Sequence, residues 1–164
     1  MKRWILVGVL AVFLCGCKAA DTMETVKDVW AEPEKPAPRE VSVKLPGEAA
    51  VPAAESENGR MYLCRDYEIY IQTLNAGDLD ATVRSVSGYG SEDLQVIATS
   101  PDGVDRYDFV WASAGENGDR LGRGVILDDG SYHYVLSVLR DADTAKTSQV
   151  VWSEVFDSFM LNTD

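Results

Sequence analysis

Proline is distributed unevenly along this chain of 164 residues, and this limits where a compact fold can form. Five of the six prolines lie between Ala31 and Asn58, in a segment that also repeats alanine and glutamate. Proline lacks a backbone N–H and fixes φ, so such a segment favours an extended linker. We therefore expect a tether over residues 17–38 and one domain over 39–162, with 46–59 as a loose loop.

The first residues of the chain combine a positive start with a short apolar run. Lys2 and Arg3 precede residues 4–14, which are apolar. This run is too short to cross a bilayer core, which needs about 20 residues, and the pattern is typical of a cleavable secretory signal. An ordinary signal would need a small residue at position −3 of the cleavage site, where this chain has Leu14.

The run Leu14-Cys15-Gly16-Cys17 resembles the lipobox of bacterial lipoproteins, in which an apolar and a small residue precede an acceptor cysteine. The resemblance implies cleavage between Gly16 and Cys17, removal of the signal peptide 1–16, and a diacylglyceryl group with acyl chains such as palmitate on Cys17. Two acyl chains anchor a protein stably without a transmembrane helix. We therefore expect an extracytoplasmic protein anchored by lipid to the cell membrane, or to an outer membrane where the host has one.

Cysteine content and charge further limit what kind of protein this is. With Cys15 removed and Cys17 acylated, Cys64 alone remains, so no intramolecular disulfide can form. Its strand-like surroundings favour a small buried hydrophobe over a nucleophile. The net charge is −12, and no window clusters lysine and arginine, which argues against a nucleic-acid partner. We interpret the acidity as a solvated surface.

The second half of the chain predicts an antiparallel meander. Turn signals rich in Gly, Asn and Asp separate four β-rich runs. These runs are residues 93–99, 107–114, 121–127 and 132–139. Two earlier strands are expected over 61–63 and 67–74, and the alternating residues 40–45 predict an edge strand.

Two helices complete the predicted fold. Asp78 and Gly88 are a typical cap and stop for a helix of about ten residues. A second helix begins near residues 144–148 and carries an apolar stripe of Val151, Trp152, Val155, Phe156, Phe159 and Met160. Large aromatics also alternate on one strand face at Tyr107, Phe109 and Trp111. One helix stripe packed on the sheet predicts an α+β sandwich.

This order of elements, with the closing pattern Trp152-x-x-Val155-Phe156-x-x-Phe159, resembles the PsbP-like superfamily over residues 39–161. That superfamily spans photosystem extrinsic subunits, a Ran-binding import factor and many bacterial lipoproteins. The resemblance implies a binding or assembly module rather than an enzyme. It lies in topology and composition, not in a chemical motif, so no functional residue is carried over.

A search for chemistry assigns no catalytic, cofactor-binding or metal-binding residue. His133 is the single histidine, and we interpret it as a surface or cross-strand residue rather than a catalytic base. No zinc motif or phosphate-binding glycine loop occurs. The acidic residues that could be calcium ligands are better explained by turns. They are Asp102, Asp105, Asp128, Asp129, Asp141 and Asp143.

The leading hypothesis is a non-catalytic binding or assembly module of the cell envelope. Its partners would be the membrane, through the lipid on Cys17, and an envelope protein or small ligand. A small-ligand carrier is the alternative, and it would need an apolar pocket lined by residues such as Tyr107, Trp111, Tyr132 or Tyr134. An envelope hydrolase ranks below both, and it would need carboxylates gathered near His133.

The lipid anchor can be tested directly. Labelling of growing cells with a fatty-acid probe should tag the wild-type chain and leave Cys17→Ser untagged, because the serine hydroxyl does not replace the acceptor thiolate. In-gel detection of the probe is the measurement. Equal labelling of both chains would rule out the anchor.

Overall fold

The computed structural model of this protein describes residues 35–115, 118–144 and 149–162. These residues belong to one compact unit that begins at Lys35. The signal peptide, Cys17 and the tether up to residue 34 lie outside the described residues. In the part of the chain that is described, no helix is long and apolar enough to cross a membrane.

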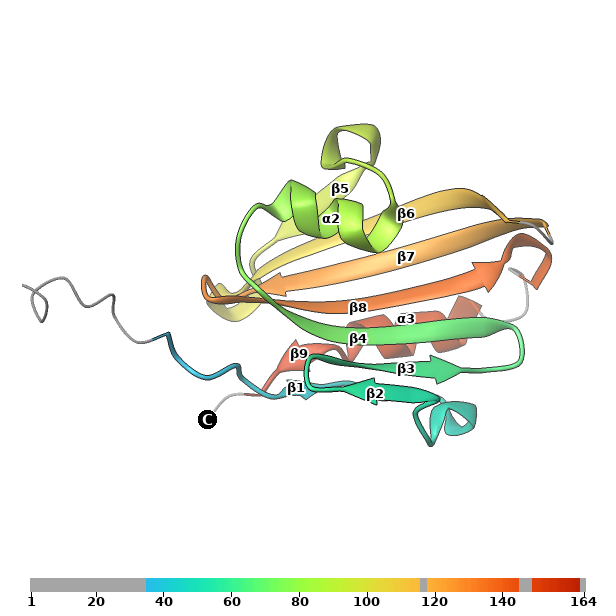
Figure 1. Cartoon of the computed structure of the whole chain (residues 1–164), viewed down its shortest axis with the longest axis horizontal. Helices are drawn as coiled ribbons and strands as arrows, with labels where there is room; N and C mark the ends of the chain where they lie inside the picture. The colour runs from blue at the N-terminus through green and yellow to red at the C-terminus, as the bar shows by residue number, and fades with distance from the viewer. Residues whose placement is uncertain (1–34, 116–117, 145–148, 163–164) are drawn as a thin grey trace, which may run out of the picture. The chain divides into compact units, whose positions relative to one another are not determined.

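The described unit is built on a seven-stranded antiparallel sheet with the order β2-β3-β4-β8-β7-β6-β5 (Figure 1). Its last four strands in sequence form the expected meander, and β4 closes back onto β8. The strands are β2 Ala54–Ser56, β3 Gly59–Leu63, β4 Tyr67–Asn75, β5 Val96–Thr99, β6 Asp105–Gly115, β7 Gly118–Asp128 and β8 Tyr132–Asp141. Four short 3-10 turns lie at Gly47–Ala49, Ser91–Asp93, Pro101–Gly103 and Ala142–Thr144.

Two helices cover opposite faces of this sheet (Figure 1). Helix α2, Leu79–Ser87, places Val83 in one core with Phe109, Trp111, Ile126 and Val135. Helix α3, Gln149–Asp157, contributes to a second core on the other face through Trp152, Val155 and Phe156, followed by Phe159. The prediction of an α+β fold with a short helix and a packed C-terminal helix is thus confirmed.

The ends of α2 are determined locally, as the sequence predicts. The Asp78 carboxylate accepts the backbone N–H of Asp80, which satisfies one of the free donors of the first turn. Gly88 ends the helix with φ of 82°, and its N–H donates to the Arg84 carbonyl. A left-handed residue at this position favours glycine.

The aromatic face of β6 packs against α2 rather than α3. Phe109 and Trp111 pair in register with Gly124 and Gly122 of β7, and their rings lie over these glycines. A Cβ atom at Gly122 would come within 2.0 Å of the Trp111 ring. Glycine on β7 therefore makes room for aromatics on β6, and both belong to the α2 side of the sheet.

Three local predictions need correction. Within 40–45 only β1, Val41–Ser42, is a strand, and it pairs with β9, Met160–Leu161, instead of the main sheet. Within 46–59, expected to be a loop, Ala54–Ser56 forms β2 because it folds back as a hairpin on β3. Met160 is not part of the helix stripe, because α3 ends at Asp157 and the strand geometry of β9 turns Met160 outward, 53% exposed.

The packing of α3 can be tested by truncating its central ring. Phe156 is fully buried, so Phe156→Ala should lower the free energy of unfolding by about 3–5 kcal/mol. The matched control is Ser153→Ala on the exposed side of α3, which should change it by less than about 0.5 kcal/mol. Urea unfolding followed by circular dichroism gives both values. A loss below about 1 kcal/mol at Phe156 would contradict this packing.

Candidate functional site

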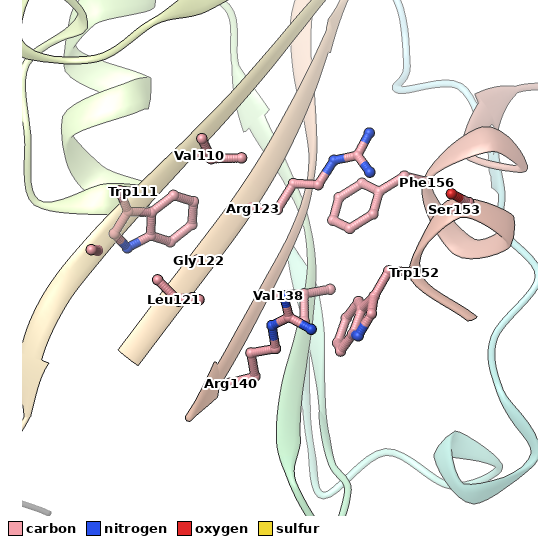
Figure 2. A pocket seen from close by; sticks show the side chains of 11 residues that line it. Val110, Trp111, Leu121, Gly122, Arg123, Val138, Arg140, Trp152, Ser153 and Phe156 are labelled. Atoms are coloured by element: carbon pink, nitrogen blue, oxygen red, sulfur yellow. The ribbon is translucent and has the colours of Figure 1, made fainter. Parts of the chain in front are cut away.

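A partly enclosed groove of about 570 Å³ runs along α3 on its face of the sheet, and we call it the α3 groove. Its floor is Val110, Leu121 and Val138, one from each of β6, β7 and β8, and its opposite wall is Trp152 and Phe156 (Figure 2). The other lining residues are Trp111, Ala112, Gly122, Arg123, Arg140 and Ser153. The site therefore combines aliphatic, aromatic and guanidinium groups.

Strand register explains why these side chains share one face. Val110 pairs with Arg123, and Arg123 pairs in turn with Val138. Leu121 pairs with Arg140 one step further along the same two strands. Because residues two apart on a strand point to the same side, both pairs project toward α3. Each pair brings an arginine next to an aliphatic side chain.

The groove exists because α3 covers only part of this face. The helix packs over residues of β4 and β8, including Ile69 and Leu136, which are fully buried. Val110 on β6 lies beyond the helix and stays 61% exposed. An apolar side chain left uncovered beside an aromatic wall is the kind of surface that binds other molecules.

Both arginines of the groove lie against aromatic rings. The Arg123 guanidinium carbon is 4.2 Å from the centroid of Phe156, and that of Arg140 is 5.6 Å from the centroid of Trp152. Cation–π contacts of this kind hold each guanidinium group against its ring. In Figure 2 the two guanidinium groups lie beside these rings.

Arg123 also belongs to a cluster that fixes the end of α3. Asp108 accepts hydrogen bonds from Arg123 Nη2 at 3.2 Å and from Arg106 Nε at 2.8 Å. Arg106 donates further to the main-chain carbonyls of Phe156 and Phe159, at 3.1 and 3.3 Å. Carbonyls at a helix C-terminus are favourable acceptors for arginine. Two arginines share one carboxylate, so the cluster carries a net positive charge.

The charge of the groove lining contrasts with that of the chain. The sequence has 27 acidic and 15 basic residues, yet the described residues that line the groove include two arginines and no carboxylate. A neighbouring hollow that shares Arg123 is different, because Asp102, Asp108 and Asp157 also line it. In addition, the buried Trp152 Nε1 has no hydrogen-bond acceptor among the described residues.

His133 is buried rather than on the surface. It is 1% exposed, with Nδ1 2.8 Å from Thr82 Oγ1 and Nε2 3.4 Å from Asp128 Oδ2, its cross-strand neighbour. A hydroxyl, an imidazole and a carboxylate in sequence resemble a nucleophilic triad. The hydroxyl, however, must be reached by a substrate, and Thr82 is a buried residue of α2, 8% exposed. We therefore assign the trio to joining α2 to the sheet.

The aromatics named for a carrier pocket do not gather in one place. Trp111 is among the residues at the edge of the α3 groove, but its ring, like Tyr107, packs on the α2 side. The Tyr132 hydroxyl donates to the Pro36 carbonyl. The Tyr134 hydroxyl donates to Asp129 and accepts the Arg39 N–H, and burial with the Asp129 hydrogen bond raises the pKa of Tyr134 to about 12. These two tyrosines fasten residues 36–39 to the sheet.

The turn interpretation of the acidic residues holds at β7–β8. Asp128 accepts the Gly130 N–H, and Asp129 accepts those of Ser131 and Tyr132. Among the described residues no group of three or more potential metal ligands occurs. Cys64 is half-buried, and burial raises the pKa of its thiol. Gly16 and Cys17, the residues assigned to cleavage and lipidation, lie outside the described residues.

Sequence reasoning missed the α3 groove. One signal was present at Val110, an apolar residue between the buried Phe109 and Trp111, where strand alternation calls for a polar one. Arg123 and Arg140 gave no comparable signal, since isolated arginines on strands are ordinary surface residues. Their proximity depends on strand register and on the placement of α3.

These features define the described unit as an α+β sandwich, a fold that it shares with solved structures. Solved structures with this fold include cyanobacterial PsbP from Synechocystis, with TM-score 0.51 and 12% identity over 82% of this chain and 99% of that one. Another is LpqN, involved in cell envelope biogenesis of Mycobacterium tuberculosis, with TM-score 0.52 and 12% identity over 79% of this chain and 87% of that one. The chain matches no protein-family model and no curated protein.

The structural assignment of His133 predicts the effect of changing its neighbour. Thr82→Val should lower the free energy of unfolding by about 1–3 kcal/mol, because it leaves a buried imidazole nitrogen without its partner. Thr82→Ser keeps the hydroxyl and should lower the free energy of unfolding much less. Thermal or urea unfolding measures both. If valine and serine behaved alike, the hydrogen bond would not be what joins α2 to the sheet.

Proposed function

We propose that this protein is a lipid-anchored component of the cell envelope whose domain binds a partner or ligand in the α3 groove without catalysing a reaction. The observation that carries the proposal is the groove itself, an uncovered apolar floor beside an aromatic wall and two arginines. Such a surface lowers its free energy when another molecule covers it.

The anchor is supported by the sequence. The basic start, the short apolar run and the resemblance to a lipobox ending at Cys17 support a mature chain outside the cytoplasm. A tether rich in proline would then hold the domain away from the lipid surface. LpqN, which has the same fold, is involved in cell envelope biogenesis, and a role in the envelope is what we propose for this chain.

Binding fits the side chains of the groove better than catalysis does. Hydrolysis by a nucleophile needs a serine, cysteine or threonine next to a base. Among the described residues that line the groove, Ser153 has the single side-chain hydroxyl, and the charged side chains are Arg123 and Arg140. His133 belongs to the opposite side of the sheet, where it contacts α2. These groups hold a ligand but lack a general base.

The proposal can be tested with a photo-crosslinking residue in living cells. Benzoylphenylalanine in place of Val110, which is 61% exposed in the groove, should give a specific crosslinked partner or a defined mass adduct. The matched control is the same residue in place of Leu63, which is 56% exposed on β3 and does not line the groove. Immunoblotting and intact-protein mass spectrometry detect the products.

Two results would contradict the proposal. The same products at both positions would show that capture is unrelated to the groove. No product at position 110, with normal folding and membrane fractionation, would show that the groove is not used.

A further inference from the structure

We infer that the α3 groove binds a long-chain carboxylic acid in its anionic form, with the alkyl chain on the apolar floor and the carboxylate at the arginines. This inference rests on the proposed function and names the chemistry of its ligand. It also makes the second of our functional hypotheses, the small-ligand carrier, more specific.

The size and lining of the groove fit an alkyl chain. Small-ligand sites are typically about 300–1,000 Å³ and mostly apolar, and the groove measures about 570 Å³. Val110 and Leu121 are incompletely covered, so an apolar chain laid over them would remove exposed surface from water. Trp152, 8% exposed, provides an aromatic wall on the other side, and the buried Phe156 supports Arg123 from below.

The charges select the head group. Guanidinium groups are cationic and bind carboxylates through paired N–H donors, and the groove presents two of them, Arg123 and Arg140. Among the described residues, the lining contains no carboxylate that would repel an acid. Arg123 is 37% exposed at its side chain, and one of its nitrogens is used by Asp108, which leaves other N–H donors for a ligand. These groups would repel a cationic head, and a neutral head would gain only a weaker hydrogen bond than a carboxylate does.

The inference is tested on the full-length chain in isolated membranes, where acyl transfer to new lipoprotein is absent. The probe is a C16 fatty acid with a diazirine in its chain and a terminal alkyne. Matched probes carry the same chain with a primary alcohol or a trimethylammonium head. After irradiation, mass spectrometry locates the adduct, and competition with unlabelled acids gives the half-saturating concentration.

We expect the acid probe to label peptides that contain Val110, Leu121 or Trp152, at a concentration about tenfold lower than the alcohol. Shortening the unlabelled competitor acid by two methylenes should lower its affinity by about three- to tenfold, since each buried methylene adds to the affinity. Arg140→Gln should weaken binding of the acid probe by about tenfold and leave binding of the alcohol probe unchanged. Val110→Asp should abolish labelling by both.

Two variants serve as controls for the two substitutions. Arg60→Gln removes an exposed arginine that pairs with Glu55 on the outer hairpin of the sheet. Leu63→Asp places the same charge on an equally exposed apolar position outside the groove. Both should label like the wild type. Val110, Leu63 and Arg60 are exposed, so substitutions there should leave the fold intact. Arg140 is half-buried against Trp152, so circular dichroism is used to check that Arg140→Gln folds.

The possible failures are distinguishable. Equal labelling by the alcohol or trimethylammonium probe, or an unchanged affinity for the acid in Arg140→Gln, would contradict the claim that the ligand is a carboxylic acid. An adduct located in the groove would still support the proposed function in that case. Capture of a protein at position 110, with no amphiphile in the groove, would likewise contradict the carboxylic acid and support the proposed function. No groove adduct from any probe and no product at position 110 would overturn both.

Discussion

The burial of β8 on both faces is the constraint on which the rest of this structure depends. Six consecutive residues, His133–Val138, are buried, so both faces of this central strand are covered by other parts of the protein. An antiparallel strand usually needs cover on one face only, whereas this one needs a helix on each. Helix α2 covers Val135 and α3 covers Leu136, and each of these nine-residue helices has an apolar side that faces the sheet.

The groove is a consequence of how two short helices cover a wide sheet. Helix α3 is centred over β4 and β8 by Phe156, so it does not reach Val110 on β6. On the other face the aromatics of β6 need the glycines of β7, which leaves Arg123 and Leu121 to project toward α3. The Arg106–Asp108–Arg123 cluster then holds the end of α3 in place. The same contacts that stabilise the fold therefore assemble a positive, apolar hollow on an acidic protein.

The parts of the fold that could be predicted are those with local causes. Asp78 and Gly88 bound α2 because capping involves neighbours in sequence, and Asp128 and Asp129 form a turn for the same reason. The pairing of β1 with β9 joins segments more than a hundred residues apart through two residue pairs, and no local pattern indicates it. The helix stripe was extended wrongly to Met160 because helical and strand periodicity overlap at the end of α3.

The groove could not be predicted, because it is defined by what α3 leaves uncovered. Arg123 and Arg140 belong to different elements from Trp152 and Phe156, and these side chains come into contact only when β7, β8 and α3 pack together. Lipidation at Cys17 is the reverse case, since it rests on a short sequence motif and needs no tertiary structure.

A crystal structure of the protein purified under native conditions from its own membranes, without refolding, tests the central claim most directly. The account predicts elongated electron density between Val110, Leu121 and Trp152, with its polar end at Arg123 and Arg140. A groove closed by its own side chains, or bound density confined to the α2 face, would contradict it.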